Sequence, residues 1–515
     1  MVNQTNENQN AAGRLPRLLL TLAAPVLSAL IILLADLEPG KPAVTATLAV
    51  ALLMALWWVA EVVPLAVTSL LPIILFPALG IMDGRAVSVT YFNHVIFLFL
   101  GGFLVALAIQ KWNLHQRIAL GILRVVGLSP GKILLGFMFA SAFLSMWISN
   151  TATAMLMVPI LISIISKLEA LNGKDGARKL AVGLLLGIAY GCSLGGVATL
   201  VGTPPNLSFA RIFNIYFPEA PEISFASWFF FAFPITVILF VIVWAYLFLL
   251  FIRRRQPGPA LSRKEVALES RSLGPWSYEE KVVTILFVAL ALLWFFRADI
   301  VIGSFAIPGW SNLFAHPDYF NDGTVAIFVS VLLFLIPARQ EEGFLMDWAA
   351  AEDIPWGIIL LFGGGFALAS GFKESGLSLW FGNQLAWLKG VHPIILIASI
   401  AFLVTFLTEL TSNTATVETI LPVLAGLAIS IEANPLLFML PATVAGSLAF
   451  MLPVATPPNA IVFGTGRLEV IQMARAGLAL NFLGVFIVTL STYYLGTAVF
   501  GIDLTVFPDW AAAGH

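Results

Sequence analysis

Two short polar motifs occur in both halves of the chain, in surroundings that are strongly apolar. Ser-Asn-Thr-Ala-Thr stands at Ser149–Thr153 and again at Ser412–Thr416, and a Thr-Pro-Pro-Asn follows each copy, at Thr203–Asn206 and Thr456–Asn459. Ser, Thr and Asn are preferred helix N-caps, and helix N-termini bind anions through free N–H groups and the positive end of the helix dipole. The motifs therefore predict an anion site built from neutral dipoles and hydroxyls, with no Arg or Lys near either Ser-Asn-Thr.

The opposite helix ends at these motifs suit a cation. Unwound carbonyls and the C-terminal ends of half-helices coordinate Na⁺ in transporters with broken helices. Ser145 and Thr408 each lie four residues before a motif, about one helical turn away. Asn150 and Asn413 add side-chain oxygens, so this cation site needs no acidic residue.

Each feature also has a purely structural interpretation. Small polar residues in membrane helices often serve close packing alone, but paired copies with a Pro-Pro break downstream favour a binding site. The repeated Gly-Gly-Phe at Gly101–Phe103 and Gly364–Phe366 is interpreted as a packing or kink position. Glu409 is an acid at membrane depth, where a structural role and a role in ion coupling are equally compatible with its position. Glu61 is expected in a cytoplasmic turn between two spans.

The composition places the chain in a bilayer. Of its 515 residues 60% are hydrophobic and 10% are charged, against about 25% charged residues in a soluble domain. Apolar runs of about 17–25 residues recur, which is the length of a spanning helix. The single Cys192 excludes an internal disulfide, and the net charge of −2 gives no sign of a nucleic-acid partner. Because no nucleophile–base pair or metal-ligand motif is present, the sequence argues against an enzyme.

These motifs require helices that end inside the membrane. Between Lys132 and Lys167 lie about 34 uncharged residues, too many for one helix across a ~30 Å core and too few for two spans. We interpret this segment as a re-entrant hairpin with Ser-Asn-Thr at its tip. Each Thr-Pro-Pro predicts a helix broken at mid-membrane, because Pro cannot continue a helix interior but fits the first turn of a new one.

The fold class predicted is an all-α membrane protein with two repeats of inverted topology. Basic residues, which mark the cytoplasmic side, flank both ends of the first hairpin, whereas Ile431–Pro435 after the second hairpin has none. Loops 213–226 and 298–321 are expected outside, and Lys373 and Lys389 are exceptions to the charge rule. An amphipathic helix at Lys111–Val126 is expected either in the membrane interface or as a connector. The predicted parts are a disordered cytoplasmic N-terminus (1–17), a first transmembrane helix (18–43), repeat 1 (44–252, with hairpin 132–166 and broken helix 177–212), a cytoplasmic linker (253–278) and repeat 2 (279–515, with hairpin 393–430 and broken helix 437–466).

At these motifs the chain resembles the divalent anion/sodium symporter family, the INDY-like carriers of di- and tricarboxylates and sulfate. The resemblance runs from about residue 18 to 498 and includes the Thr408–Thr411 stretch that leads into the second motif. It implies about eleven spans and two hairpins per protomer, a homodimer in the bacterial inner membrane, an N-terminus in the cytoplasm and a C-terminus outside. It also implies an elevator movement, Na⁺ as the co-transported ion and no organic cofactor.

The resemblance also implies the site residues. Thr414 favours C4-dicarboxylates such as succinate, malate and fumarate, because citrate-preferring members tend to have an apolar residue there. Glu418 departs from the family pattern, and it either faces the outer interface or perturbs the second cation site. One sodium site would include Ser145, Ser149, Asn150 and Gly202, a second Thr408, Ser412, Asn413 and Ala455, and the substrate would lie between Asn150, Thr151, Thr203, Asn413, Thr414, Thr456 and Pro457.

The function predicted is Na⁺-coupled symport of C4-dicarboxylates. Na⁺-independent dicarboxylate exchange and Na⁺-coupled transport of citrate or sulfate are the alternatives on the same fold. A channel is disfavoured, because sites buried under two re-entrant tips indicate occlusion and not a continuous pore.

Overall fold

The protein is helical throughout most of the part that the computed structural model describes, which is residues 21–127, 129–253, 273–302, 305–504 and 506–512. Among these described residues, eight helices are long and apolar enough to cross a membrane, and six further apolar helices have 10–17 residues. The prediction of a helical membrane protein is confirmed. The predicted N-terminal segment 1–17 and most of the linker 253–278 lie outside the described residues.

The first repeat begins after the helix Thr21–Leu34. Two of its helices begin at side-chain caps, Asp83 before α5 and Asn93 before α6, whose oxygens accept N–H bonds from the first turn. The first repeat then contains one hairpin, one broken helix and one long span. In order, its elements are α2 (Pro42–Ala60), α3 (Leu65–Thr68), α4 (Leu71–Ala78), α5 (Gly84–Thr90), α6 (His94–Lys111), α7 (Leu114–Val126), α8 (Pro130–Ser145), α9 (Asn150–Asn172), α10 (Lys174–Val197), α11 (Pro204–Tyr216), α12 (Phe225–Leu247) and the π-helix η1 (Phe248–Ile252).

The second repeat follows the same plan. It starts with a capping box, in which Ser277 and Glu280 satisfy each other's backbone N–H groups. One prediction needs correction: the expected outer loop 298–321 contains two short antiparallel strands, paired Ile300 with Ile307. The elements are α14 (Tyr278–Phe295), β1 (Ile300–Ile302), β2 (Phe305–Ile307), η2 (Trp310–Leu313), η3 (Pro317–Tyr319), α15 (Asp322–Leu335), α16 (Trp348–Ala351), α17 (Trp356–Ser375), α18 (Leu377–Gln384), η4 (Ala386–Leu388), α19 (Pro393–Thr408), α20 (Asn413–Ser430), α21 (Leu436–Ala445), α22 (Pro457–Phe463), α23 (Val470–Phe500) and α24 (Asp509–Ala512).

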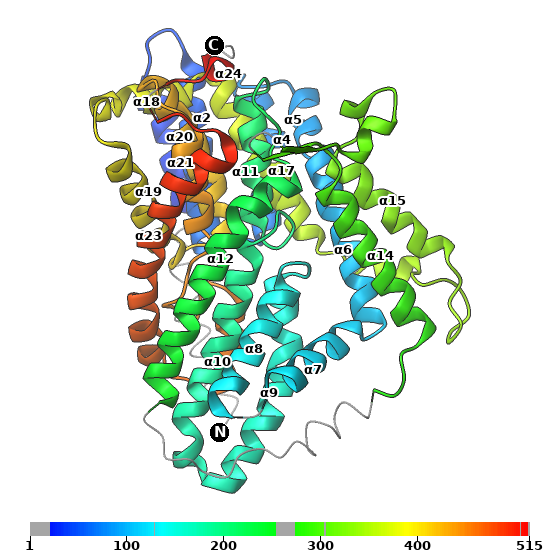
Figure 1. The fold of residues 1–515 in the computed structure, drawn as a ribbon. Coiled ribbons are helices and arrows are strands. Elements are labelled where there is room, and N and C mark those ends of the chain that lie inside the picture. Colours follow the sequence, from blue (N-terminus) through cyan, green and yellow to red (C-terminus); the bar gives the residue numbers. More distant parts are fainter. Residues whose placement is uncertain (1–20, 128, 254–272, 303–304, 505, 513–515) are drawn as a thin grey trace.

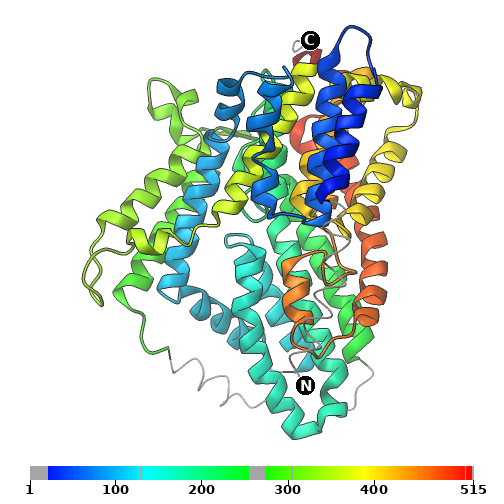
Figure 2. The ribbon, with the colours of Figure 1, turned by 180° about the vertical axis from the view of Figure 1, so that it is seen from behind.

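The two helical hairpins point toward each other. The α8–α9 pair occupies the lower half of the molecule with its tip at mid-height, and the α19–α20 pair occupies the upper half with its tip directed downward (Figures 1 and 2). The two broken helices, α10–α11 and α21–α22, are interrupted at 198–203 and 446–456. Four helix N-termini, those of α9, α11, α20 and α22, and the C-termini of the four helices before them are thereby brought to the middle of the protein.

Glycines let the helices around the hairpins approach closely. A Cβ at Gly195 would lie 2.1 Å from the carbonyl oxygen of Ala142, so α10 contacts the backbone of α8 directly. In the second repeat a Cβ at Gly426 would lie 1.9 Å from the carbonyl oxygen of Ser378, which brings α20 against α18. The Gly-Gly-Phe stretches act in the same way, since a Cβ at Gly101 or Gly364 would overlap Ala326 or Ser69. Their interpretation as packing positions is confirmed.

A buried ion-pair network ties the upper loops together. Arg297 donates to Asp322 at 2.5 Å and to Glu222 at 2.8 Å, and its side chain is 5% exposed. Burial lowers the pKa of the Arg297 guanidinium, but the two carboxylates raise it more, so the pKa lies above its ordinary value. The network joins the loop after α14 to the start of α15 and to the segment before α12.

Replacing Arg297 with Ala should destabilise the protein by about 3–5 kcal/mol, because two carboxylates lose a buried partner. Thermal unfolding of the purified protein in detergent measures this. The matched control is Lys389→Ala, which removes the exposed pair of Lys389 with Glu432 and should cost less than about 1 kcal/mol. Equal effects of the two substitutions would show that the Arg297 network does not hold the loops.

Candidate functional site

Both Ser-Asn-Thr motifs and both Thr-Pro-Pro motifs line one cavity at the centre of the protein. The cavity has a volume of about 720 Å³. The family resemblance makes fifteen assignments to the sodium and substrate sites, in which Asn150 and Asn413 are each counted twice. Of these residues only Ser145 and Thr408 do not line the cavity, and both are fully buried next to it. The motif residues that line it are Ser149, Asn150, Thr151, Gly202, Thr203, Ser412, Asn413, Thr414, Ala455, Thr456 and Pro457.

Each hairpin tip is closed by the same contact between its two arms. In the first hairpin the Ser145 hydroxyl donates to Asn150 Oδ1 at 2.5 Å. In the second hairpin the Thr408 hydroxyl lies 2.6 Å from Asn413 Oδ1. The residue pairs occupy the same positions relative to the two motifs, so the repeats build equivalent tips from different hydroxyl side chains.

The breaks in the two long helices are also held by equivalent residues. Asn206, which ends the first Thr-Pro-Pro-Asn, donates through Nδ2 to the carbonyl oxygens of Thr199 (2.7 Å) and Gly196 (3.1 Å). Asn459 donates to those of Leu452 (3.0 Å) and Ala449 (3.2 Å). These side chains satisfy the carbonyls that the interrupted helices leave without partners, which a bilayer requires.

Only some of the predicted N-caps form. The Ser149 hydroxyl accepts from Ala152 N–H at 3.2 Å and the Thr456 hydroxyl accepts from Asn459 N–H at 3.3 Å. The side chains of Thr203 and Ser412 make no cap bond, so this part of the prediction is wrong for α11 and α20. The sequence could not tell the caps that form from those that do not, because the cap bond depends on the rotamer of the Ser or Thr side chain.

The two Thr-Pro-Pro termini offer fewer N–H donors than the prediction assumed. α11 and α22 each begin with two prolines, which carry no N–H. The first turns of α9 and α20, which begin at Asn150 and Asn413, retain theirs, and first-turn N–H groups have no acceptor within their own helix. Backbone recognition of an anion therefore falls mainly to the two hairpin tips.

Oxygen atoms converge behind each tip. A Cβ at Gly196 would lie 2.6 Å from Asn150 Oδ1 and 3.1 Å from the carbonyl oxygen of Gly202, so both oxygens flank one glycine beside Ser145. Behind the second tip the Thr408 hydroxyl is 3.0 Å from the carbonyl oxygen of Gly446 as well as close to Asn413. Each cluster holds several acceptor oxygens and a single hydroxyl proton, an arrangement that a monovalent cation would satisfy.

Gly446 was missed by the sequence analysis. Its contribution is a backbone carbonyl, which every residue type carries, so composition gives no signal for it. Among the described residues no group of three His, Cys, Asp or Glu side chains converges in a way that would hold a metal ion. A cation at the tips would thus be bound by neutral oxygens.

Glu409 has a structural role in this arrangement. Its carboxylate accepts N–H bonds from Phe450, Met451 and Leu452, at 2.7, 2.8 and 3.1 Å, and from Asn481 Nδ2 at 2.8 Å. It thereby holds the unwound segment between α21 and α22 against the end of α19 and against α23. In the first repeat the equivalent position is Met146, whose carbonyl accepts from the Thr199 hydroxyl.

The cavity wall also includes residues that the motifs do not predict. Trp58, Phe99, Phe103 and Ile358 contribute apolar surface to the cavity wall. Glu61 lies in the turn after α2, and it is the one charged residue among the described residues that line the cavity. The sequence analysis expected this turn on the cytoplasmic side, whereas the structure places it at the central cavity. The backbone of Glu61 has a φ of 44°, in the left-handed region that non-glycine residues rarely adopt and that is enriched at functional sites.

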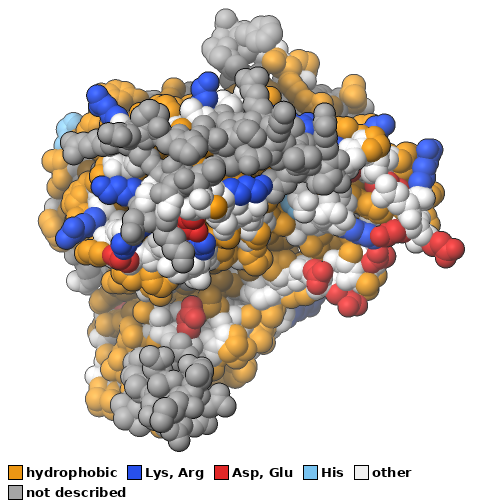
Figure 3. Space-filling model, turned by 90° about the horizontal axis from the view of Figure 1, so that it is seen from below, with side chains coloured by type: hydrophobic (Ala, Val, Ile, Leu, Met, Phe, Trp, Pro, Cys, Tyr) orange, Lys and Arg blue, Asp and Glu red, His pale blue; other side chains and the backbone are white. Residues whose placement is uncertain are grey.

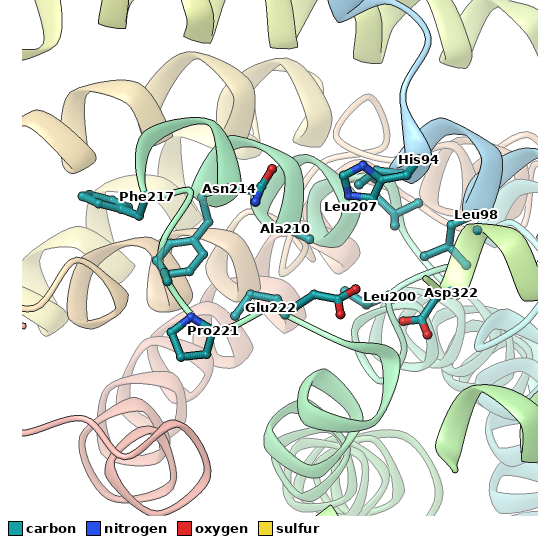
Figure 4. A pocket seen from close by; sticks show the side chains of 15 residues that line it. His94, Leu98, Leu200, Leu207, Ala210, Asn214, Phe217, Pro221, Glu222 and Asp322 are labelled. Atoms are coloured by element: carbon teal, nitrogen blue, oxygen red, sulfur yellow. The ribbon is translucent and has the colours of Figure 1, made fainter. Parts of the chain in front are cut away.

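A second pocket lies near the outer loops but has the wrong charge for an anion. It has a volume of about 40 Å³, and His94, Asn214, Glu222 and Asp322 contribute its polar lining. Figure 4 shows the Glu222 and Asp322 carboxylates facing the space between them. Arg297, the nearby cation, is already bound to both carboxylates.

Glu418 does not lie where the sequence analysis first placed it. It is fully buried, and its Oε1 accepts from the Ser208 hydroxyl of α11 at 2.8 Å. On its other side is Gly365 of α17, at which a Cβ would lie 2.3 Å from the carboxyl carbon. Of the two alternatives that the sequence left open, a position facing the outer interface is wrong, because α11 and α17 cover Glu418. A perturbation of the second cation site stays a prediction.

Comparison with known proteins identifies the family. Residues 15–502 match the model of the sodium:sulfate symporter transmembrane region. The chain belongs to this family. The sodium-dependent dicarboxylate transporter SdcS of Staphylococcus saprophyticus is 42% identical over 511 residues, covering 97% of this chain and 95% of that protein. The protein of the same name from Staphylococcus aureus strain MRSA252 is 44% identical over 466 residues, covering 89% and 87%.

Solved structures with a similar fold are membrane transporters of low sequence identity. The YdaH transporter of Alcanivorax borkumensis has a TM-score of 0.53 at 16% identity, with 80% of this chain and 86% of that chain covered. MtrF of Neisseria gonorrhoeae, described as one of a class of antimetabolite efflux pumps, has a TM-score of 0.51 at 13% identity, with 81% of each chain covered. These similarities concern the fold alone.

Replacing Glu409 with Ala should destabilise the protein by about 3 kcal/mol, because four N–H donors, two of them buried and two part-buried, lose their acceptor. Glu409→Gln, which keeps one acceptor oxygen, should be intermediate. Thermal unfolding with and without Na⁺ measures both effects. A Gln variant with wild-type stability but altered Na⁺ dependence would instead assign Glu409 to ion coupling.

Proposed function

We propose that this protein is a secondary active transporter that carries C4-dicarboxylates together with Na⁺. The observation that supports this most strongly is the single central cavity onto which two equivalent hairpin tips converge. Each tip combines N–H donors suited to a carboxylate with oxygen clusters suited to a cation. The names of the similar staphylococcal proteins, sodium-dependent dicarboxylate transporters, agree with this chemistry.

The charge of the cavity makes substrate binding depend on the cations. Its described lining contains no Lys, Arg or His, and its one charged residue is the acid Glu61. A dianion placed there is stabilised only by dipoles and hydroxyls unless Na⁺ ions bind close by. Coupling then follows from electrostatics, since each ion lowers the free energy of binding the other.

We assign the sodium sites to the two oxygen clusters and the substrate site to the space between the tips. The first cluster includes Ser145, Ser149, Asn150 and Gly202, and the second Thr408, Ser412, Asn413 and Ala455, to which we add the carbonyl of Gly446. Substrate carboxylates would contact Thr151 and Thr414 beside the two asparagines. The Thr414 hydroxyl supports a short dicarboxylate over citrate. Thr203, Thr456 and Pro457 close the remaining side.

We further propose an orientation and a movement. Figure 3 shows Lys and Arg side chains spread over the lower face, which we assign to the cytoplasm, so that the C-terminal α24 lies outside. Alternating access would carry the hairpins and broken helices past the helices that contact them, in an elevator movement. A homodimer in the inner membrane would hold those outer helices fixed.

The proposed function predicts that an inward Na⁺ gradient drives labelled succinate into proteoliposomes containing the purified protein. Uptake should fall by about tenfold or more when Na⁺ is replaced by K⁺, because the empty cation sites leave the dianion without counter-charge. Uptake that is indifferent to Na⁺, together with counterflow driven by internal succinate, would establish exchange instead. Stronger competition by citrate or sulfate than by unlabelled succinate would identify that anion as the preferred substrate.

Asn150→Ala and Asn413→Ala should each raise the Na⁺ concentration for half-maximal uptake by about tenfold, the effect of losing an interaction of about 1.4 kcal/mol. Protein yield and thermal stability should stay near wild type, since both side chains are only half-buried. Asn214→Ala, in the second pocket, is the matched control and should leave Na⁺ dependence unchanged. Normal Na⁺ dependence in both tip variants would refute the assignment.

A further inference from the structure

Glu418 is the buried acid that the proposed transport chemistry does not use. It lies in α20, five residues after Asn413, and is fully buried. Its Oε1 has one hydrogen-bond donor, the Ser208 hydroxyl, and its Oε2 has no partner. An acid at membrane depth is a functional candidate by default and calls for a partner.

The two buried acids of the second hairpin are solvated very differently. Glu409 accepts four hydrogen bonds from N–H donors, which can stabilise an ionised carboxylate. Glu418 accepts one bond from a neutral hydroxyl. An ionised carboxylate with so little compensation is costly in an apolar interior, so the geometry favours a neutral carboxylic acid at Glu418. The Ser208 hydroxyl can donate a hydrogen bond to the acid or accept one from the carboxyl O–H group.

Within the part of the chain that the structure describes, no cationic side chain hydrogen-bonds to the acid. The described helices that pack most closely against α20 are α2, α11, α17, α18, α19 and α21, and four of them (α2, α18, α19 and α21) contain no ionisable residue. α11 carries Arg211, which donates to Asn214, and Tyr216, which donates to Ala369. α17 carries Lys373, which donates to the carbonyl of Ile215, and the exposed Glu374.

The space around the carboxyl group fits a proton and not a metal ion. Gly365 of α17 closes one side, since a Cβ there would lie 2.3 Å from both the carboxyl carbon and Oε2. Among the described residues, Ser208 is the one whose side-chain oxygen hydrogen-bonds to the carboxyl group from another helix. A metal ion would need several further oxygen ligands, for which the glycine contact leaves no room.

We propose that Glu418 is a proton-binding site, which keeps its proton while α20 is packed against α17 and exchanges it with water when the two helices separate. The only bond that forms or breaks is the carboxyl O–H bond. The proposal rests on the proposed function in one respect, since the separation of α20 from α17 is taken to occur during transport. An ionised Glu418 would then oppose the return of α20 to α17, so transport should slow as pH rises.

The test is Na⁺-driven uptake of labelled fumarate at a series of values from about pH 6 to pH 9, a range over which both fumarate carboxylates stay ionised. Wild-type uptake should fall about tenfold across the range, and Glu418→Gln, which mimics the neutral acid, should vary by less than about twofold. Glu374→Gln, which removes the exposed acid of α17, is the matched control and should keep the wild-type profile. A wild-type profile in Glu418→Gln would overturn the proposal, as would a folded Glu418→Gln protein that is inactive at every pH.

Infrared spectra of the purified protein give a readout that does not depend on transport. Wild type at neutral pH should show a protonated-carboxyl band, and Ser208→Ala should shift that band because the acid loses its hydrogen bond. This comparison also decides the matter if Glu418→Gln fails to fold or if Na⁺ drives no fumarate uptake in wild type. If Na⁺ drives no fumarate uptake in wild type, the proposed function fails, but the infrared comparison still tests the proton site. The absence of a band that responds to Ser208→Ala would refute the site.

Discussion

The structure depends on satisfying backbone groups where helices end inside an apolar protein. A spanning helix bonds all of its interior N–H and C=O groups, but a hairpin tip or a broken helix leaves several without partners. Asn206 and Asn459 satisfy the carbonyls at the two breaks, and Glu409 satisfies three N–H groups in the second. What these side chains leave unsatisfied faces the central cavity.

This constraint connects the fold to the chemistry. The first-turn N–H groups of α9 and α20 and the oxygen clusters behind them are directed at the same space by the convergence of the two hairpins. Neutral groups of this kind bind a dianion weakly enough for its release, and they require cations for tight binding. Glu61, the one charged residue among the described residues that line the cavity, is held in an unusual backbone conformation and adds to that requirement.

Much of this could be predicted from sequence because repetition and proline are strong signals. The two Ser-Asn-Thr motifs and the two Thr-Pro-Pro motifs gave the hairpin tips and the helix breaks within a few residues. The contribution of Gly446 could not be predicted, since it is a backbone carbonyl. Nor could the absence of cap bonds from the Thr203 and Ser412 side chains, which depends on their rotamers, or the burial of Glu418, which depends on how α11 and α17 meet over α20. The strands at 300–307 have no alternating pattern long enough to separate them from a loop.

The most direct test of the central claim is a cryo-electron microscopy structure of the protein in Na⁺ and succinate. The account predicts substrate density between Asn150–Thr151 and Asn413–Thr414, with ion density beside Ser145 and Thr408. Substrate density in the outer pocket lined by His94 and Glu222, or hairpin tips that do not share one cavity, would contradict it.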